Sequence, residues 1–183
     1  MTYEIDIAGL KRELPICKVT DDLYIGAFVM FGDVELTVHC ASVLLERAPE
    51  YDYIIAPEAK AIPLLYEMSR QSGNEKYIVA RKKAKAYMKN PIVVNVQSIT
   101  TAGVQTLVLD ADDAELMKGK RIIILDDVIS TGESLRAVEE LVNTAGGNIV
   151  GKMAVLAEGD AFDRDDIIVL GKLPLFNADG SVK

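Results

Sequence analysis

The chain has 183 residues, of which 50% are hydrophobic and 26% are charged, a composition that suits a globular domain and excludes a disordered chain. Its 20 Lys and Arg residues against 28 Asp and Glu residues give a net charge of −8, which argues against general nucleic-acid binding because such a surface repels phosphate backbones. Two cysteines and one histidine are too few for a disulfide framework or a histidine-cluster metal site. No apolar run approaches the roughly 20 residues that cross a bilayer, and residues 1–13 lack a signal-peptide pattern, so we expect a cytoplasmic protein with no membrane partner.

Helical and strand patterns alternate along the middle of the chain. Helical spacing of apolar residues predicts helices over Glu35–Ala48, Lys60–Ser72 and Gly132–Ala145, and a turn into a short helix at Asp110–Glu115. Short apolar runs predict strands at Tyr53–Ala56, Tyr77–Ala80, Ile92–Val94, Ile122–Leu125 and Ile149–Leu156. Most of these runs are continuously apolar, which is typical of parallel strands covered on both faces. We therefore expect an α/β fold, with a doubly wound, mostly parallel central sheet flanked by helices and a ligand site at the carboxyl ends of its strands.

The segment with the strongest functional signal follows the predicted strand Ile122–Leu125. Two adjacent acids, Asp126 and Asp127, come next, and a loop rich in hydroxyl side chains then leads into the strongest predicted helix. Helix N-termini bind phosphate through unsatisfied N–H groups and the helix dipole, and two carboxylates can accept hydrogen bonds from neighbouring sugar hydroxyls. The segment thus predicts a site for a ribose 5-phosphate, although Ser130 or Thr131 could instead simply cap the helix.

Residues 125–134, Leu-Asp-Asp-Val-Ile-Ser-Thr-Gly-Glu-Ser, resemble the phosphoribosyl pyrophosphate (PRPP) motif of the type I phosphoribosyltransferases. The resemblance implies that Asp126 and Asp127 hold the ribose hydroxyls during catalysis, with Asp126 also a candidate ligand of PRPP-bound Mg²⁺. It implies a 5-phosphate site formed by Val128, Ile129, Ser130, Thr131, Gly132, Glu133 and Ser134. Glu133 departs from the pattern, since many members have Gly or Thr there, so its carboxyl must point away from the phosphate.

Two more segments extend the resemblance to the groups that would bind pyrophosphate. Glu58-Ala59-Lys60-Ala61 is similar to the Glu-Ala-Arg-Gly of adenine phosphoribosyltransferases, and Lys60 keeps the charge but loses the bidentate fork of arginine. Residues 81–89 contain five cations and no acid, and their Arg-Lys-x-x-Lys pattern resembles one shared by the adenine and orotate enzymes. The resemblance implies that pyrophosphate is bound by Glu58, Ala59, Lys60, Arg81 and Lys85. Three other cations are as consistent with a solvated face as with this role: Lys82, Lys83 and Lys89.

A polar stretch between the strand-like runs Ile92–Val96 and Thr106–Leu109 reads as a hairpin tip. In the family that the chain resembles, a flexible loop here closes over the site and excludes water. We expect Ser98, Thr100 and Thr101 to belong to that loop, although a plain hairpin is the alternative. Thr101 stands where the adenine enzymes have a proton-handling Glu, and no carboxylate lies between Gln97 and Gln105.

The nucleobase pocket has the weakest signal in the sequence. Phe28 or Phe31 could stack on a purine or belong to the core, and Glu158 could accept from an exocyclic amine or be a solvated loop acid. His39 lies in an apolar helical pattern and reads as a core or surface residue rather than a catalyst. With no linker or repeat, we expect one domain over residues 1–183, with an N-terminal hood over about 1–35, a core over 36–156 and a C-terminal extension over 157–183.

The function that the resemblance implies is purine salvage, in which adenine and PRPP give AMP and pyrophosphate. It also implies the type I phosphoribosyltransferase fold, substrate-bound Mg²⁺, no organic cofactor and a homodimer. Two alternatives stay open at this point. The base could be guanine, xanthine, hypoxanthine or orotate, or the chain could be a PRPP-binding regulator without catalysis. A regulator would need a nucleic-acid surface, and the first 35 residues contain few cations for one.

Overall fold

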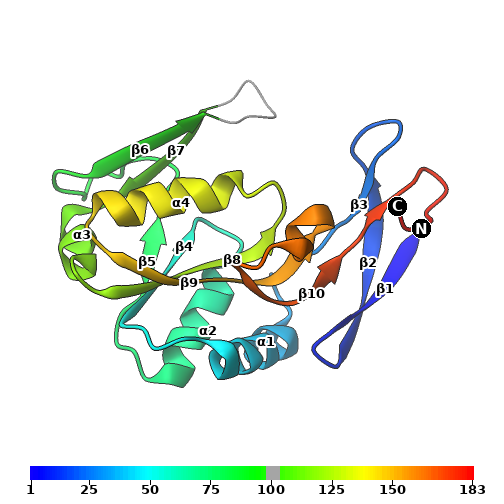
Figure 1. Cartoon of the computed structure of the whole chain (residues 1–183), viewed down its shortest axis with the longest axis horizontal. Coiled ribbons are helices and arrows are strands. Elements are labelled where there is room, and N and C mark those ends of the chain that lie inside the picture. Colours follow the sequence, from blue (N-terminus) through cyan, green and yellow to red (C-terminus); the bar gives the residue numbers. More distant parts are fainter. Residues whose placement is uncertain (98–103) are drawn as a thin grey trace.

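The computed structural model describes residues 1–97 and 104–183 and is built around a sheet of five parallel strands (Figure 1). The strands lie in the order β10 (Ile168–Leu173), β9 (Asn148–Glu158), β8 (Arg121–Ile129), β4 (Tyr53–Pro57) and β5 (Ile78–Ala80). One face packs against α1 (Val34–Arg47) and α2 (Ile62–Ser72), and the other against α3 (Ala111–Met117) and α4 (Glu133–Thr144). The predicted doubly wound α/β fold is confirmed. The predicted loop residues Ser98, Thr100 and Thr101 lie outside the described residues.

The continuous apolar run of β8 is explained by its central place in the sheet. Ile123 and Leu125 belong to the hydrophobic cluster under α1 and α2, whereas Ile122 and Ile124 belong to the cluster under α4. All four are at most 1% exposed. Because successive side chains of a strand point to opposite faces, only a strand covered on both faces needs apolar residues in unbroken sequence.

The strand predicted at Ile92–Val94 is confirmed, and it lies outside the parallel sheet. β6 (Ile92–Gln97) pairs antiparallel with β7 (Val104–Leu109) in a separate two-stranded sheet that contacts α4, as the hairpin prediction requires. Val93 is 50% exposed whereas Val94 is buried. The two-stranded sheet therefore needs apolar residues on one face only. The backbone of Arg81 bridges to Val108 and ties the hairpin to β5.

Two boundaries also differ from the sequence patterns. α2 begins at Ile62 rather than Lys60, with Pro63 in its first turn, where the missing N–H of proline costs no helical hydrogen bond. β8 continues through Asp126 and Asp127 to Ile129, because residues 128 and 129 still pair with β9. The two acids therefore lie within the strand instead of ending it.

An antiparallel sheet at the N-terminus was not predicted from the sequence. It has the order β1 (Thr2–Ile7), β2 (Leu10–Lys18), β3 (Tyr24–Gly26) and β11 (Leu175–Phe176), and both chain ends lie in it (Figure 1). Its buried residues Ile5, Ile7 and Leu14 share one hydrophobic cluster with α1 and α2. The edge strand β10 was also missed. Residues from the two ends of the chain thus meet on one side of the central sheet.

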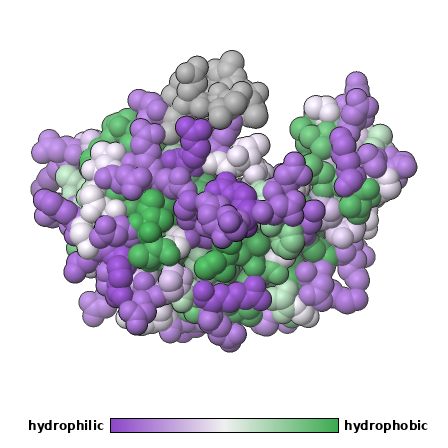
Figure 2. Space-filling view, in the orientation of Figure 1, coloured by the Kyte–Doolittle hydropathy of each residue, from purple (hydrophilic) through white to green (hydrophobic). Residues whose placement is uncertain are grey.

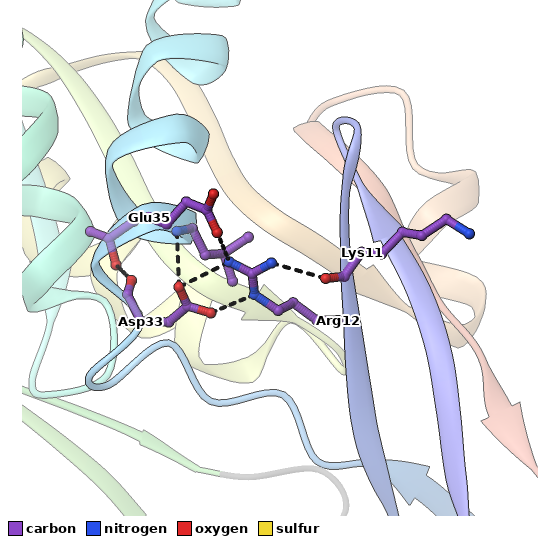
Figure 3. A network of polar contacts seen from close by, with 6 residues as sticks. Lys11, Arg12, Asp33 and Glu35 are labelled. Carbon is purple, nitrogen blue, oxygen red and sulfur yellow. Dashed lines mark hydrogen bonds and ion pairs between the residues drawn. The ribbon is translucent and has the colours of Figure 1, made fainter.

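Arg12 fastens this N-terminal sheet to the start of α1 (Figure 3). Its Nε and Nη2 donate to the two carboxylate oxygens of Asp33 at 2.6 and 3.1 Å, and Nη2 also donates to Glu35 at 2.7 Å. Asp33 is the N-cap of α1 and accepts from the Leu36 N–H at 3.0 Å. The Arg12 guanidinium lowers the pKa of Asp33, so the capping carboxylate stays ionised. The ring nitrogen Nε2 of His39 lies 2.7 Å from the Ala8 carbonyl oxygen, so this histidine makes a structural contact with the N-terminal sheet.

Candidate active site

The acid pair lies near the carboxyl end of β8, between β4 and β9. Asp127 is 2% exposed, and its N–H donates to Asp126 Oδ1 at 2.9 Å. Lys60 Nζ lies 2.9 Å from Asp127 Oδ2, as an ion pair rather than a well-aligned hydrogen bond. Burial raises the pKa of Asp126, and the neighbouring Asp127 carboxylate raises it further. A buried carboxyl group with a raised pKa gains from any ligand that donates hydrogen bonds to it.

The loop after β8 forms a small concavity at the N-terminus of α4. It has a volume of about 170 Å³ and is lined by Asp126, Val128, Ile129, Ser130, Thr131, Gly132, Glu133, Ser134 and Leu135. The structure thus brings together the whole predicted 5-phosphate segment. The N-cap residue is Gly132, with φ of 79°, rather than Ser130 or Thr131, although Thr131 Oγ1 accepts from the Glu133 N–H at 3.5 Å.

Gly132 is required for two reasons. A positive φ strains residues with a Cβ, and a Cβ here would lie 2.8 Å from Nη1 of Arg164. Arg164 donates to both carboxylate oxygens of Asp166 at 2.8 Å, and Asp166 pairs with Lys152. The guanidinium of Arg164, held by this network, therefore packs directly on Gly132. No pattern in the sequence predicts this contact.

The Glu58–Lys60 loop and the basic segment meet at one carboxylate. Glu58 Oε2 accepts from the Lys82 N–H at 3.1 Å and lies 3.1 Å from Arg81 Nε. These two contacts lower the pKa of Glu58, the Lys82 N–H contributing most. Arg81 also donates to the Tyr87 hydroxyl at 2.9 Å, and the Glu58–Ala59 peptide is cis. Glu58 thus fixes the start of the basic segment beside the carboxyl end of β4.

A larger cavity of about 810 Å³ joins these parts. It is lined by Pro57, Glu58, Ala59, Lys60, Lys82, Asp126, Asp127, Val128, Ser130, Ser134, Thr106, Leu107, Ile25, Gly26, Ala27, Phe28, Val29, Glu158 and Leu173. The predicted residues Arg81 and Lys85 do not line it, whereas Lys82 does. In the orientation of Figure 2, a notch separates the N-terminal sheet on the right from the rest of the molecule.

One end of the cavity is mostly apolar, and we call it the apolar end: Ile25–Val29, Glu158 and Leu173. Of the two predicted aromatic residues, Phe28 lines it and is 5% exposed, so it serves the core and the cavity wall together. Phe31 is 52% exposed and does not line the cavity. The sequence did not point to Leu173, because β10 has no strong strand pattern.

No group of three or more His, Cys, Asp and Glu side chains in residues 1–97 and 104–183 can hold a metal ion. No helix in those ranges is long and apolar enough to cross a membrane. A metal ion at the acid pair must therefore draw part of its coordination from a bound ligand or from water.

Comparison with known proteins identifies the class to which this fold and site belong. The model of the phosphoribosyl transferase domain family matches residues 40–172, so the chain belongs to the phosphoribosyltransferases. It is 28% identical to the adenine phosphoribosyltransferase of Thermosipho africanus, over 90% of this chain and 94% of that protein. It is 33% identical to the adenine phosphoribosyltransferase of Petrotoga mobilis, over 84% of this chain and 86% of that protein.

A solved structure supports the fold. The crystal structure of adenine phosphoribosyltransferase from Thermoanaerobacter pseudethanolicus matches with a TM-score of 0.66 and 22% identity, covering 77% of this chain and 83% of that one. The type I phosphoribosyltransferase fold expected from the PRPP motif is therefore confirmed, and the chain is an enzyme of this class.

Proposed function

We propose that this protein transfers the phosphoribosyl group of PRPP to adenine, giving AMP and pyrophosphate. The observation that carries the proposal is the single cavity in which the acid pair, the loop at α4, the Glu58–Lys60 loop and an apolar end meet. Support for adenine comes from the relatives, which are similar over most of their length and are named as adenine enzymes. In the reaction, a bond forms between the base nitrogen and the anomeric carbon, the bond from that carbon to pyrophosphate breaks, and the base proton leaves to solvent.

The phosphate and ribose of PRPP occupy the part of the cavity nearest to α4. The 5-phosphate binds the backbone N–H groups and hydroxyls of residues 130–134, where the helix dipole adds positive potential. Asp126 and Asp127 accept from the ribose hydroxyls, and the Lys60 ammonium lies 2.9 Å from Asp127 Oδ2 beside them. Holding the sugar in this way orients the anomeric carbon toward the base, and such positioning is a large part of catalysis.

Pyrophosphate leaves on the side of β4. Lys60 and Lys82 line the cavity there, and Glu58 holds Arg81 beside them. These cations stabilise the negative charge that develops on the leaving group. The predicted contribution of Lys85 stays a prediction, since it does not line the cavity and its N–H donates to Met88 Sδ at 3.4 Å.

The acid pair also fits the Mg²⁺ that accompanies PRPP in this family. Carboxylate oxygens are preferred ligands of Mg²⁺, and Asp127 Oδ2 has no hydrogen-bond donor among the described residues apart from its ion pair with Lys60. Asp126 and Asp127 would hold the ion together with the substrate. Bound there, Mg²⁺ supplies charge neutralisation for the pyrophosphate. The homodimer and the cytoplasmic location stay predictions.

The test is turnover of a panel of bases with PRPP and Mg²⁺, scored by pyrophosphate release and by chromatography of the nucleotide. We expect adenine to be converted to AMP faster than guanine, hypoxanthine, xanthine or orotate. The double variant Asp127→Asn, Thr131→Ala should remain folded by circular dichroism and lose PRPP affinity, because each lost charged hydrogen bond costs roughly 1.5–3 kcal/mol. Tight PRPP binding without turnover of any base would instead identify a regulator, and faster turnover of another base would refute adenine.

A further inference from the structure

Glu158 ends β9, which lies on the opposite side of β8 from β4, the strand that precedes Lys60. β9 lies next to β8, and the Glu158 backbone pairs with Leu173 of β10. The Glu58–Lys60 loop follows β4, which lies on the other side of β8. Because the strands are parallel, their carboxyl ends form one edge, along which the pyrophosphate groups lie on one side of Asp126 and Glu158 lies on the other.

The surroundings of Glu158 are apolar. Its neighbour Leu173 approaches the segment Ile25–Val29, since a Cβ on Gly26 would lie 3.3 Å from Leu173 Cδ1. Glu158, Leu173 and that segment all line the cavity. Among the described residues, the Glu158 carboxyl has no hydrogen bond or ion pair. Its half-burial raises its pKa, and the charge of Lys60 acts in the opposite direction. A hydrogen-bond acceptor that is partly removed from water and has no partner gains from a donor that a ligand brings.

We propose that Glu158 selects the nucleobase by accepting a hydrogen bond from the exocyclic amine of a 6-aminopurine. The inference rests on the proposed function, which puts the base at the apolar end. An ionised carboxylate only accepts hydrogen bonds, so it favours an amine at this place and repels the keto oxygen of a 6-oxopurine. Phe28 and Leu173 give every purine similar apolar contacts and discriminate little between them. The three other acids that line the cavity have different contacts: Asp127 is paired with Lys60, Asp126 lies beside Asp127, and Glu58 is held by Arg81 and the Lys82 N–H.

The experiment crosses two changes, one in the base and one in the protein. Adenine and unsubstituted purine, which lacks the amine, are each supplied with saturating PRPP and Mg²⁺ to wild type, Glu158→Met and Glu158→Gln. Glu158→Met should lower kcat/KM for adenine roughly 10- to 100-fold, the usual effect of losing a hydrogen bond to a charged group. The same variant should leave purine turnover within about threefold. Glu158→Gln keeps an accepting oxygen and should recover part of the adenine activity.

Two controls separate base selection from a structural role. PRPP affinity, measured by calorimetry, should be nearly the same in all three proteins, because no hydrogen bond or ion pair joins Glu158 to Lys60 or to the loop at α4 among the described residues. Asp160→Asn removes the same charge two residues further on, at an exposed position outside the cavity, and should change neither base. Equal losses of kcat/KM for adenine and purine in Glu158→Met, or an unchanged preference for adenine, would overturn the inference. In that case turnover of adenine by the wild type would still support the proposed function. Wild type inactive with both bases would overturn the proposed function and this inference with it.

Discussion

The ion pair between Lys60 and Asp127 should be worth more than an ordinary surface pair. We consider Lys60→Met, which removes the charge and keeps the length of the side chain. The variant leaves the Asp127 carboxylate, whose side chain is 3% exposed, without the cation that lies 2.9 Å away. Removing one partner of a fully buried pair costs about 3–5 kcal/mol, whereas exposed pairs contribute about 0–1 kcal/mol. The Lys60 side chain is 54% exposed, so water screens part of its attraction to Asp127. We therefore expect Lys60→Met to lower the free energy of unfolding by about 1–2 kcal/mol.

Urea unfolding at neutral pH measures this cost in a double-mutant cycle with Asp127→Asn. Once the carboxylate is neutral, Lys60→Met should cost almost nothing, so the double variant should be less destabilised than the sum of the two single variants. Lys83→Met, at an exposed position in the basic segment, is the control and should change the unfolding free energy by less than about 0.5 kcal/mol. If the stability losses of the two single variants add up to that of the double variant within about 0.5 kcal/mol, the reasoning is refuted. Additive losses are the behaviour of sites that do not interact.

Three further predictions concern other parts of the site. The pKa of Asp126 is raised from 3.8 to about 8, so its contribution to stability is present at acid pH and is lost as pH rises from about 4 to about 8. Thermal melts should show that Asp126→Asn reduces this decline and is more stable than wild type above neutral pH; an unchanged pH profile would contradict the cause given for the shift. Lys82→Ala should weaken PRPP and pyrophosphate several-fold more than Lys85→Ala in calorimetry, because only Lys82 lines the cavity, and equal effects would mean a general electrostatic patch. Arg12→Ala should lower stability by removing the two hydrogen bonds to Asp33. It should raise KM for the base more than KM for PRPP, because Asp33 follows the cavity segment Ile25–Val29; matched changes in both KM values would show a global effect instead.

The part of the site that the sequence could predict is the part that is continuous in the chain. Residues 125–134 form a buried strand, the acid pair, the loop and the helix start, and each contributes through its own backbone or its nearest neighbours. A phosphate bound by successive N–H groups therefore leaves its pattern in adjacent residues. The parallel sheet was predictable for a similar reason, since strands covered on both faces must be apolar at every position.

Local composition could not decide which cation of the basic segment lines the cavity. The sequence favoured Arg81 and Lys85, but Glu58 binds Arg81 and the Lys82 N–H, and Lys82 is the one that lines the cavity. Glu58 lies 24 residues from Lys82 in the chain. Contacts over such a distance depend on how β4 and β5 pair in the sheet, and no short window of sequence contains that information.

The ends of the chain are the clearest case in which only the tertiary structure decided. β3 and β11 pair with each other although they come from opposite ends of the sequence, and they bring Ile25–Val29 and Leu173 to one end of the cavity. Most residues of β10 are only partly buried, so its sequence carries neither a continuous apolar run nor a clean alternation. The sequence by itself therefore determined the proposed ribose 5-phosphate site, because its residues form one contiguous segment. The tertiary structure decided where the proposed base pocket lies, because that end of the cavity exists only after both termini have packed against the sheet.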